Sequence, residues 1–128
     1  MIGYVTVGVS DMDKSAAFYD AVFGELGFGR IMEMETFIVW SSSMQACGYS
    51  ITKPFNGEAM TAGNGTMFAI AAKSRADVDK VYARAIAEGG TCEGEPGLPG
   101  DPSMNFYAGY FRDLDGNKLN CYVMGADS

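Results

Sequence analysis

YVTVGVSDMDKSAAFYDAV, residues 4–22, is the stretch that decides how this chain is expected to fold. Its opening is rich in β-branched residues and predicts a strand over residues 4–9. Ser10 and Asp13 follow as an S-x-x-D pair, which is typical of a helix N-terminus because the Ser hydroxyl accepts a hydrogen bond from a backbone N–H of the first turn. Apolar residues then recur at three- and four-residue spacings, so a strand followed by an amphipathic helix is expected.

The same pattern returns 64 residues later, where Ser74 and Asp77 form a second S-x-x-D pair. A strand-like run over 66–72 precedes this pair, and an apolar helical pattern follows it. Further strand-like runs come after each helix, at 28–34, 37–42 and 47–53 in the first half and at 91–95, 106–112 and 119–124 in the second. The chain is therefore predicted to be one α+β domain over residues 1–128 with two βαβββ modules in tandem, the first over about 1–54, a linker over about 55–65 and the second over about 66–125.

The composition argues against several classes of protein. The formal net charge is −7 and the nine basic residues are scattered, so no basic stripe is available for a phosphate backbone and a nucleic-acid partner is not expected. No apolar run approaches the roughly 20 residues that span a bilayer, so no membrane association is expected, and residues 1–9 have the pattern of a strand rather than of a signal peptide. The three cysteines fall in no C-x-x-C pair, so neither a zinc site nor a disulfide framework is indicated, and a reducing cytoplasm is the expected setting.

Two stretches at opposite ends of the chain resemble a known family. The first is the run from Tyr4 to Asp11 with the helix start SAAFY at 15–19, and the second is FRDLDGNKL at 111–119, close to an F-x-D-P-D-G-N pattern. With the βαβββ repeat, they make the chain resemble the vicinal oxygen chelate family of glyoxalase, bleomycin-resistance and extradiol dioxygenase proteins over nearly its whole length. The resemblance implies a curved, mixed, cup-shaped sheet, a small-molecule ligand inside it and a homodimer.

The segment from Asp113 to Asn117 allows two interpretations. A calcium loop of the EF-hand type would need an oxygen ligand at Phe111, a glutamate where Tyr122 stands, and helices on both sides. A tight hairpin turn needs only residues that accept positive φ, which Asp115 and Gly116 supply. The hairpin turn is the favoured interpretation.

The resemblance also implies a divalent metal held inside the cup by four His, Gln or Glu side chains. The corresponding positions fall at Tyr4 on the first strand, at Met67 or Phe68 on the fifth, at Asn120 on the last, and near Tyr49 or Ser50. The chain contains no histidine, and zinc, iron and manganese sites require imidazole, thiolate or carboxylate donors. No metal and no other cofactor are therefore expected.

Aromatic and amide side chains on the predicted strands are the candidates for an alternative, metal-free site. Such a pocket binds flat or partly apolar small molecules through ring faces, with phenol and amide groups fixing their orientation. The competing interpretation is that these aromatic residues belong to the sheet core. The candidate ligand-binding residues are Tyr4, Trp40, Phe68, Tyr107, Tyr110, Asn120 and Tyr122.

Several other residues have both a functional and a structural interpretation. Lys53 and Arg112 stand at strand ends, where they either grip an anionic substituent or are solvated. Glu33 and Glu35 are either a buried general base or solvated charges at a sheet edge. The nine methionines are expected mainly to fill gaps in the core rather than to line a pocket. Since no catalytic pair is positioned by the sequence, no catalytic residue is assigned.

Three functions fit these observations. The first is a small-molecule binding protein of this fold that lacks the usual metal ligands, with no reaction assigned. The second is a metal-dependent lyase resembling lactoylglutathione lyase, or a dioxygenase. The third is a resistance protein that sequesters a cationic drug in an acidic cleft, which the net charge permits without selecting it.

Overall fold

The computed structural model describes residues 1–125 and contains two modules, each with a strand, a helix and three further strands. The first module consists of β1 (Tyr4–Gly8), α1 (Met12–Gly24), β2 (Gly29–Met34), β3 (Phe37–Ser41) and β4 (Gly48–Thr52). The second consists of β5 (Phe68–Ala71), α2 (Arg75–Ala87), β6 (Thr91–Gly97), a short 3-10 helix (Pro102–Met104), β7 (Phe106–Arg112) and β8 (Lys118–Met124). The predicted α+β class and tandem βαβββ organisation are confirmed, and the segment between the modules contains no helix or strand.

Each module forms its own four-stranded mixed sheet. The strand order is β1-β4-β3-β2 in the first sheet and β5-β8-β7-β6 in the second. The pairs β1–β4 and β5–β8 are parallel and the others are antiparallel, so the two sheets are copies of one arrangement. In the described residues no backbone ladder joins β1 to β5, and the mixed sheet is therefore divided in two rather than continuous.

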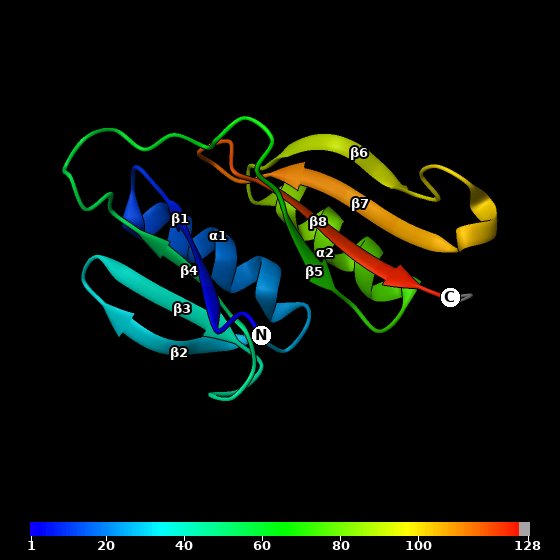
Figure 1. Ribbon diagram of the computed structural model, residues 1–128, viewed down its shortest axis with the longest axis horizontal. Coiled ribbons are helices and arrows are strands. Elements are labelled where there is room, and N and C mark those ends of the chain that lie inside the picture. The colour runs from blue at the N-terminus through cyan, green and yellow to red at the C-terminus, as the bar shows by residue number, and fades with distance from the viewer. Residues whose placement is uncertain (126–128) are drawn as a thin grey trace.

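Each sheet has one side covered by its helix and one side that we call its open face. Figure 1 shows α1 and α2 lying behind the sheets, with the open faces towards the viewer. On β1, Val7 points to the helix side and is 7% exposed, whereas Tyr4 lies on the open face and is 61% exposed. Strand residues alternate between the two sides, so this assignment extends along every paired strand.

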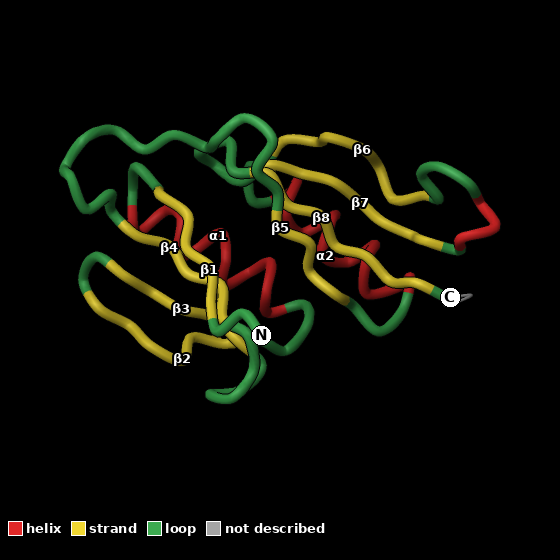
Figure 2. The backbone as a smooth tube through the Cα atoms, in the orientation of Figure 1, coloured by secondary structure: helices red, strands yellow, loops and turns green. Residues whose placement is uncertain are grey.

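The core lies between the helices and the two sheets and is shared by both modules. Helix α1 contributes Phe18, Tyr19, Val22 and Phe23, and α2 contributes Val78, Val81 and Ala85. The two helices also pack against each other, as their side-by-side course in Figure 2 shows. Burying each large apolar side chain stabilises the fold by about 1.5–3 kcal/mol, so the modules stabilise one another.

The turn between β7 and β8 ties the modules together through Asp113, which is 4% exposed. Its carboxylate accepts hydrogen bonds from the Tyr19 hydroxyl at 2.6 Å and from the side chain and backbone of Asn117 at 2.9 Å. Asn117 in turn donates to the carbonyl oxygen of Gly8 at 3.0 Å. The hairpin interpretation is confirmed, although only Gly116, with φ of 90°, takes a positive φ, and the prediction that Asp115 shares it is wrong.

The start of α1 differs from the predicted one by a residue. Ser74 caps α2 as expected, since its side chain accepts from the backbone N–H of Asp77. In α1, however, the cap is Asp11, whose carboxylate accepts from the backbone N–H of Lys14 at 3.0 Å. Ser10 does not cap because its hydroxyl and backbone N–H both donate to Asp115 in the other module.

Substitution of Asp11 tests this correction. Because a lost cap leaves an orphan N–H in the first turn, Asp11→Ala is expected to lower the free energy of unfolding by about 1 kcal/mol. Asp11→Asn, which caps equally well, is expected to change it by less than about 0.5 kcal/mol. Urea unfolding followed by circular dichroism measures both. Equal losses in the two variants would contradict a capping role for this side chain.

Two remaining expectations concern cysteines and membranes. The cysteines Cys47, Cys92 and Cys121 are free thiols, in agreement with the absence of a predicted disulfide. Among residues 1–125 neither helix has the length and apolar character needed to cross a membrane.

Candidate functional site

The open face of the second sheet brings together a row of polar and aromatic side chains. Tyr110 on β7 lies directly opposite Asn120 on β8, and Tyr122 lies two residues further along β8. Asn120 is 2% exposed, and its carbonyl oxygen has no hydrogen-bond partner in residues 1–125. A buried acceptor without a partner costs about 1–3 kcal/mol, so this position calls for a donor that the described chain does not supply.

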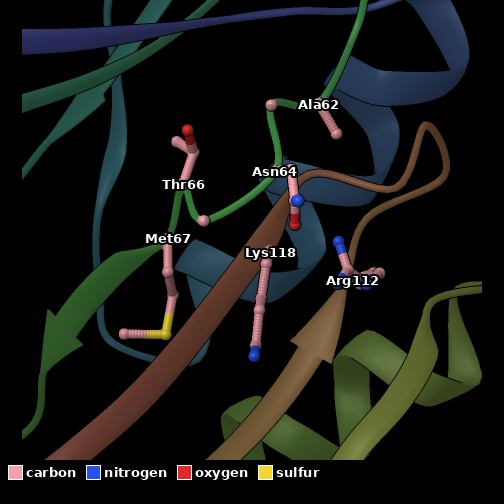
Figure 3. Close-up of a pocket in the computed structure, with 8 residues that line it drawn as sticks. Ala62, Asn64, Thr66, Met67, Arg112 and Lys118 are labelled. Carbon is pink, nitrogen blue, oxygen red and sulfur yellow. The ribbon is translucent and has the colours of Figure 1, made fainter.

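Two cations stand at the end of this row, where Arg112 and Lys118 are opposite neighbours on β7 and β8. The guanidinium of Arg112 forms an ion pair with the Glu93 carboxylate and donates a hydrogen bond to the carbonyl oxygen of Gly116 at 2.7 Å. The Lys118 ammonium lies 5.8 Å from the ring centroid of Tyr110. Figure 3 shows both side chains beside the loop over 62–67, with which they line a depression of about 620 Å³.

On the open face of the first sheet, the surroundings of Tyr4 are apolar. Tyr4 packs edge-on against Phe37 at 6.0 Å between ring centroids, beside a depression of about 220 Å³ that Met32 and Met44 also line. The prediction that the methionines mainly fill the core is wrong. Seven of the nine are exposed, because they lie on open faces, in loops or near the ends of the described chain; these are Met1, Met32, Met34, Met44, Met67, Met104 and Met124.

Three of the candidate residues lie on the helix sides of the sheets. Trp40 is 1% exposed, packs against Tyr19 and Phe23, and donates its indole N–H to Asp20 at 2.9 Å. Phe68 packs against Tyr49, and Phe68 and Trp40 both line an apolar groove of about 430 Å³ between the modules. Tyr107 donates to Asp79 on α2 at 2.6 Å, and Arg75 stacks over its ring. The remaining four, Tyr4, Tyr110, Asn120 and Tyr122, lie on open faces.

The structure fixes the register that the sequence leaves open at two of the expected metal positions. Phe68 and Tyr49 pack towards the core, so Met67 and Ser50 are the residues on the open faces. The Ser50 hydroxyl already donates a hydrogen bond to the backbone oxygen of Val5 and shares a second one with the hydroxyl of Thr6, both at 2.7 Å.

The donor set at these positions does not fit the family's divalent metal. It consists of the phenol of Tyr4, the hydroxyl of Ser50, the thioether of Met67 and the amide of Asn120, none of which is an imidazole, thiolate or carboxylate. No group of three or more His, Cys, Asp or Glu side chains with metal-binding geometry occurs within the described part of the chain. The four expected positions therefore do not supply the ligands that this divalent metal needs.

The other charged candidates lie away from this row. Glu33 is exposed and pairs with Arg30 at 2.9 Å, and Glu35 is also exposed, as expected of solvated charges at a sheet edge. Lys53 donates to the backbone oxygen of Ser10 at 2.6 Å. Lys118, which is not among the candidates proposed from the sequence, lies two residues before Asn120 and so on the same face. Period-two alternation along β8 is the signal that could have found it.

Comparison with known proteins places this arrangement in a family. The model of the Glyoxalase/Bleomycin resistance protein/Dioxygenase superfamily matches residues 1–121. A glyoxalase/bleomycin resistance protein from Albidiferax ferrireducens T118 is 39% identical and superposes with a TM-score of 0.87, over 96% of this chain and 98% of its own. No curated protein sequence gives a match.

Two more distant structures share the fold alone. A lactoylglutathione lyase from Agrobacterium tumefaciens is 20% identical with a TM-score of 0.67, and a fosfomycin resistance protein from Listeria monocytogenes is 17% identical with a TM-score of 0.70. Each comparison covers 96% of this chain and 92% of the other. On the strength of the family match and of the 39% identical structure, this chain belongs to the glyoxalase/bleomycin resistance protein/dioxygenase superfamily.

Proposed function

We propose that this protein binds a small organic molecule on the open face of its second sheet without a divalent metal. The observation that carries the proposal is Asn120, whose buried carbonyl oxygen has no partner in residues 1–125. A fold that only needed packing at this position would place an apolar side chain there, because an unsatisfied buried acceptor lowers stability. A ligand N–H or O–H would satisfy it.

The neighbours of Asn120 determine the character of this ligand. Tyr110 and Tyr122 lie on either side of it on the same face and offer ring faces together with phenol groups. Binding sites for small molecules combine apolar walls with a few polar groups that fix orientation, and this row has that composition. The ligand is therefore a small, partly flat molecule, and no bond-breaking step is assigned to it.

The metal-dependent lyase and the dioxygenase are weaker alternatives for this chain. Both belong to the repertoire of the family, but fold alone does not establish a reaction. The side chains at the expected ligand positions are unsuited to a divalent cation. Sequestration of a cationic drug is also disfavoured on this face, because its charged end carries Arg112 and Lys118.

Substitution of Asn120 by leucine tests the proposal. Asn120→Leu removes the unpartnered oxygen while keeping a similar volume, so the ligand-free protein is expected to gain about 1–2 kcal/mol in free energy of unfolding. The same variant is expected to lose the rise in melting temperature that small phenols and aromatic acids produce in the parent protein, since a ligand of the folded state raises its apparent stability. Thermal unfolding with and without these compounds measures both effects.

The matched control is Ser41→Ala, which removes a buried hydroxyl from the first sheet and leaves the second unchanged. It is expected to lower stability and to leave the ligand-dependent shift intact. A stoichiometric divalent metal in the purified protein, together with turnover of a hemithioacetal or a catechol, would contradict the proposal.

The proposal includes a homodimer in a reducing, cytoplasmic setting. Exposed apolar side chains on the open face of the first sheet, among them Tyr4, Met32 and Met34, favour a second copy as their cover, because large exposed apolar patches mark interaction surfaces. The free cysteines are compatible with a reducing compartment. Elution as a monomer at micromolar concentration in gel filtration would count against the dimer.

A further inference from the structure

The feature that goes furthest beyond the proposed function is the pair of like charges on the open face of the second sheet. Arg112 and Lys118 are direct cross-strand partners, and like charges in that position destabilise a sheet. The chain has only nine basic residues and a net charge of −7, so the pair is not a consequence of a basic composition. Its position therefore requires a local explanation.

The two cations differ in how far the described chain neutralises them. Arg112 uses its Nε on Glu93 and its Nη1 on the Gly116 carbonyl, and no hydrogen bond within residues 1–125 uses its Nη2. Lys118 forms no ion pair there; its ammonium lies 5.8 Å from the centroid of the Tyr110 ring, and its charge also acts on the nearby Glu93 carboxylate. The Nη2 amino group of Arg112 and the Lys118 ammonium thus remain without a hydrogen bond in the described residues, at adjacent positions on one face.

A loop beside the pair leaves room for a ligand group. The depression of about 620 Å³ is lined by residues 62–67 together with Arg112 and Lys118. Gly63 has φ of 81°, and a Cβ there would lie 2.7 Å from the Thr66 hydroxyl, so the turn requires glycine at this position. The loop contributes uncharged side chains, and Figure 3 shows the Asn64 side chain on the side of the loop where Lys118 and Arg112 lie.

Asn120 links this charged end to the site already described. It stands two residues after Lys118 on the same face, which is about 6.6 Å along a strand. Only 2% of the Asn120 surface is exposed, and its side-chain oxygen lacks a hydrogen-bond partner in residues 1–125. A small molecule that spans this distance along β8 and lies against Tyr110 would have one end at the cations and the other at the amide oxygen.

We propose that the ligand carries an oxyanion, a carboxylate or a phosphate, held by Arg112 and Lys118, and an N–H or O–H that donates to the Asn120 oxygen. This inference rests on the proposed function and specifies the chemical class of its ligand. A bound oxyanion relieves the repulsion between the two cations, and hydrogen bonds between charged partners are about twice as strong as neutral ones. The two anchor points also fix the direction of the molecule on the face.

The test compares probes that differ by one group. Para-hydroxybenzoate has a carboxylate and a phenol at opposite ends of one ring, para-hydroxybenzamide lacks the charge, and benzoate lacks the phenol. Isothermal titration of each into the full-length protein is expected to give at least about tenfold tighter binding for para-hydroxybenzoate than for the other two, as loss of one charge-assisted bond implies. Its affinity is expected to fall with added salt, because part of the attraction is screened.

Variants of Lys118 supply the second comparison. K118Q is expected to reduce the preference for para-hydroxybenzoate over its amide to less than about threefold, whereas K118R is expected to keep it because the charge remains. The matched control is K80Q, which removes an exposed lysine on α2 and is expected to leave the preference unchanged. Arg112 is left intact because its bonds to Glu93 and Gly116 also support the sheet.

The outcomes separate this inference from the proposed function. If the acid and the amide bind equally well and K118Q matches the parent, the oxyanion inference is overturned, while binding that N120L abolishes leaves the proposed function standing. If none of the probes binds at millimolar concentration, both are overturned. Displacement of para-hydroxybenzoate by inorganic phosphate supports the inference with phosphate as the natural group, and charge-dependent binding without such displacement supports it with carboxylate.

Discussion

Replacing Asp113 with alanine is expected to lower the free energy of unfolding by roughly 3–5 kcal/mol, because several buried donors lose their common acceptor and each costs about 1–3 kcal/mol. The donors are the Tyr19 hydroxyl, the backbone N–H groups of Asp115 and Asn117, and the Asn117 side chain. The bond from Tyr19 connects α1 with the β7–β8 turn, whereas the other three lie within the turn, so the substitution both loosens the turn and weakens the packing of one module on the other. Urea unfolding monitored by circular dichroism measures the change in midpoint.

Two further variants locate the origin of the effect. Tyr19→Phe removes one of these bonds and the 2.8 Å bond to Tyr49, and about 1–3 kcal/mol of loss is expected. Glu35→Ala removes an exposed carboxylate that forms no ion pair in the described chain, and its loss is expected to stay below about 0.5 kcal/mol. An Asp113→Ala protein as stable as the Glu35→Ala protein would mean that this carboxylate does not hold the modules together.

Raising the pH is expected to destabilise the protein, because the buried hydroxyls of Tyr19 and Tyr49 and the buried thiol of Cys121 resist ionisation in the folded state. Burial raises the pKa of Tyr19 and that of Tyr49 above the ordinary value near 10, with the nearby Asp113 charge adding to both, and burial raises the pKa of Cys121 to about 12. These groups are neutral in the folded state, so the stability associated with them is fully present below the unfolded-state pKa values and falls as the pH rises above them.

The expected magnitude follows from the linkage between ionisation and folding. Each group costs about 1.4 kcal/mol per pH unit above its unfolded pKa. The two tyrosines together remove about 4 kcal/mol between roughly pH 10 and 11.5, and Cys121 adds a loss that begins near pH 9. Urea unfolding at a series of pH values measures this slope.

Removing the groups one at a time assigns the slope to them. Cys121→Ala is expected to abolish the loss that begins near pH 9. Tyr49→Phe in that background is expected to halve the part of the slope that comes from the two buried phenols, since one of them is gone; the more exposed Tyr82 and Tyr107, whose pKa values are also raised, contribute the rest. An unfolding free energy that stayed constant up to about pH 11.5 would show that these phenols are not held neutral by the fold.

Most of the fold could be predicted from local patterns. The β-branched runs, the S-x-x-D pairs and the three- and four-residue apolar spacings depend on neighbours in the sequence, and they place every strand and both helices within a few residues of those in the structure. The misplaced cap on α1 has a non-local cause. Ser10 is engaged by Asp115, a residue 105 positions away, which no local pattern can reveal.

The candidate site was harder to predict than the fold, because the side chain of a strand residue points to only one of the two faces of its sheet. A shift by one residue moves a side chain from the core to the open face, and the sequence alone leaves Met67 against Phe68 and Ser50 against Tyr49 undecided. Docking of the helices selects the buried side, which sends Trp40, Phe68 and Tyr107 towards the helices.

Sequence alone therefore determined the family resemblance, the two-module α+β architecture, and the absence of histidine, all of which follow from composition and short-range spacing. Only the tertiary structure decided that Asn120 has a buried oxygen without a partner in residues 1–125, that Lys118 stands opposite Arg112, and that Asp113 joins the two modules. The physical reason is that each of these properties depends on which residues from distant segments become neighbours when the sheets and helices pack.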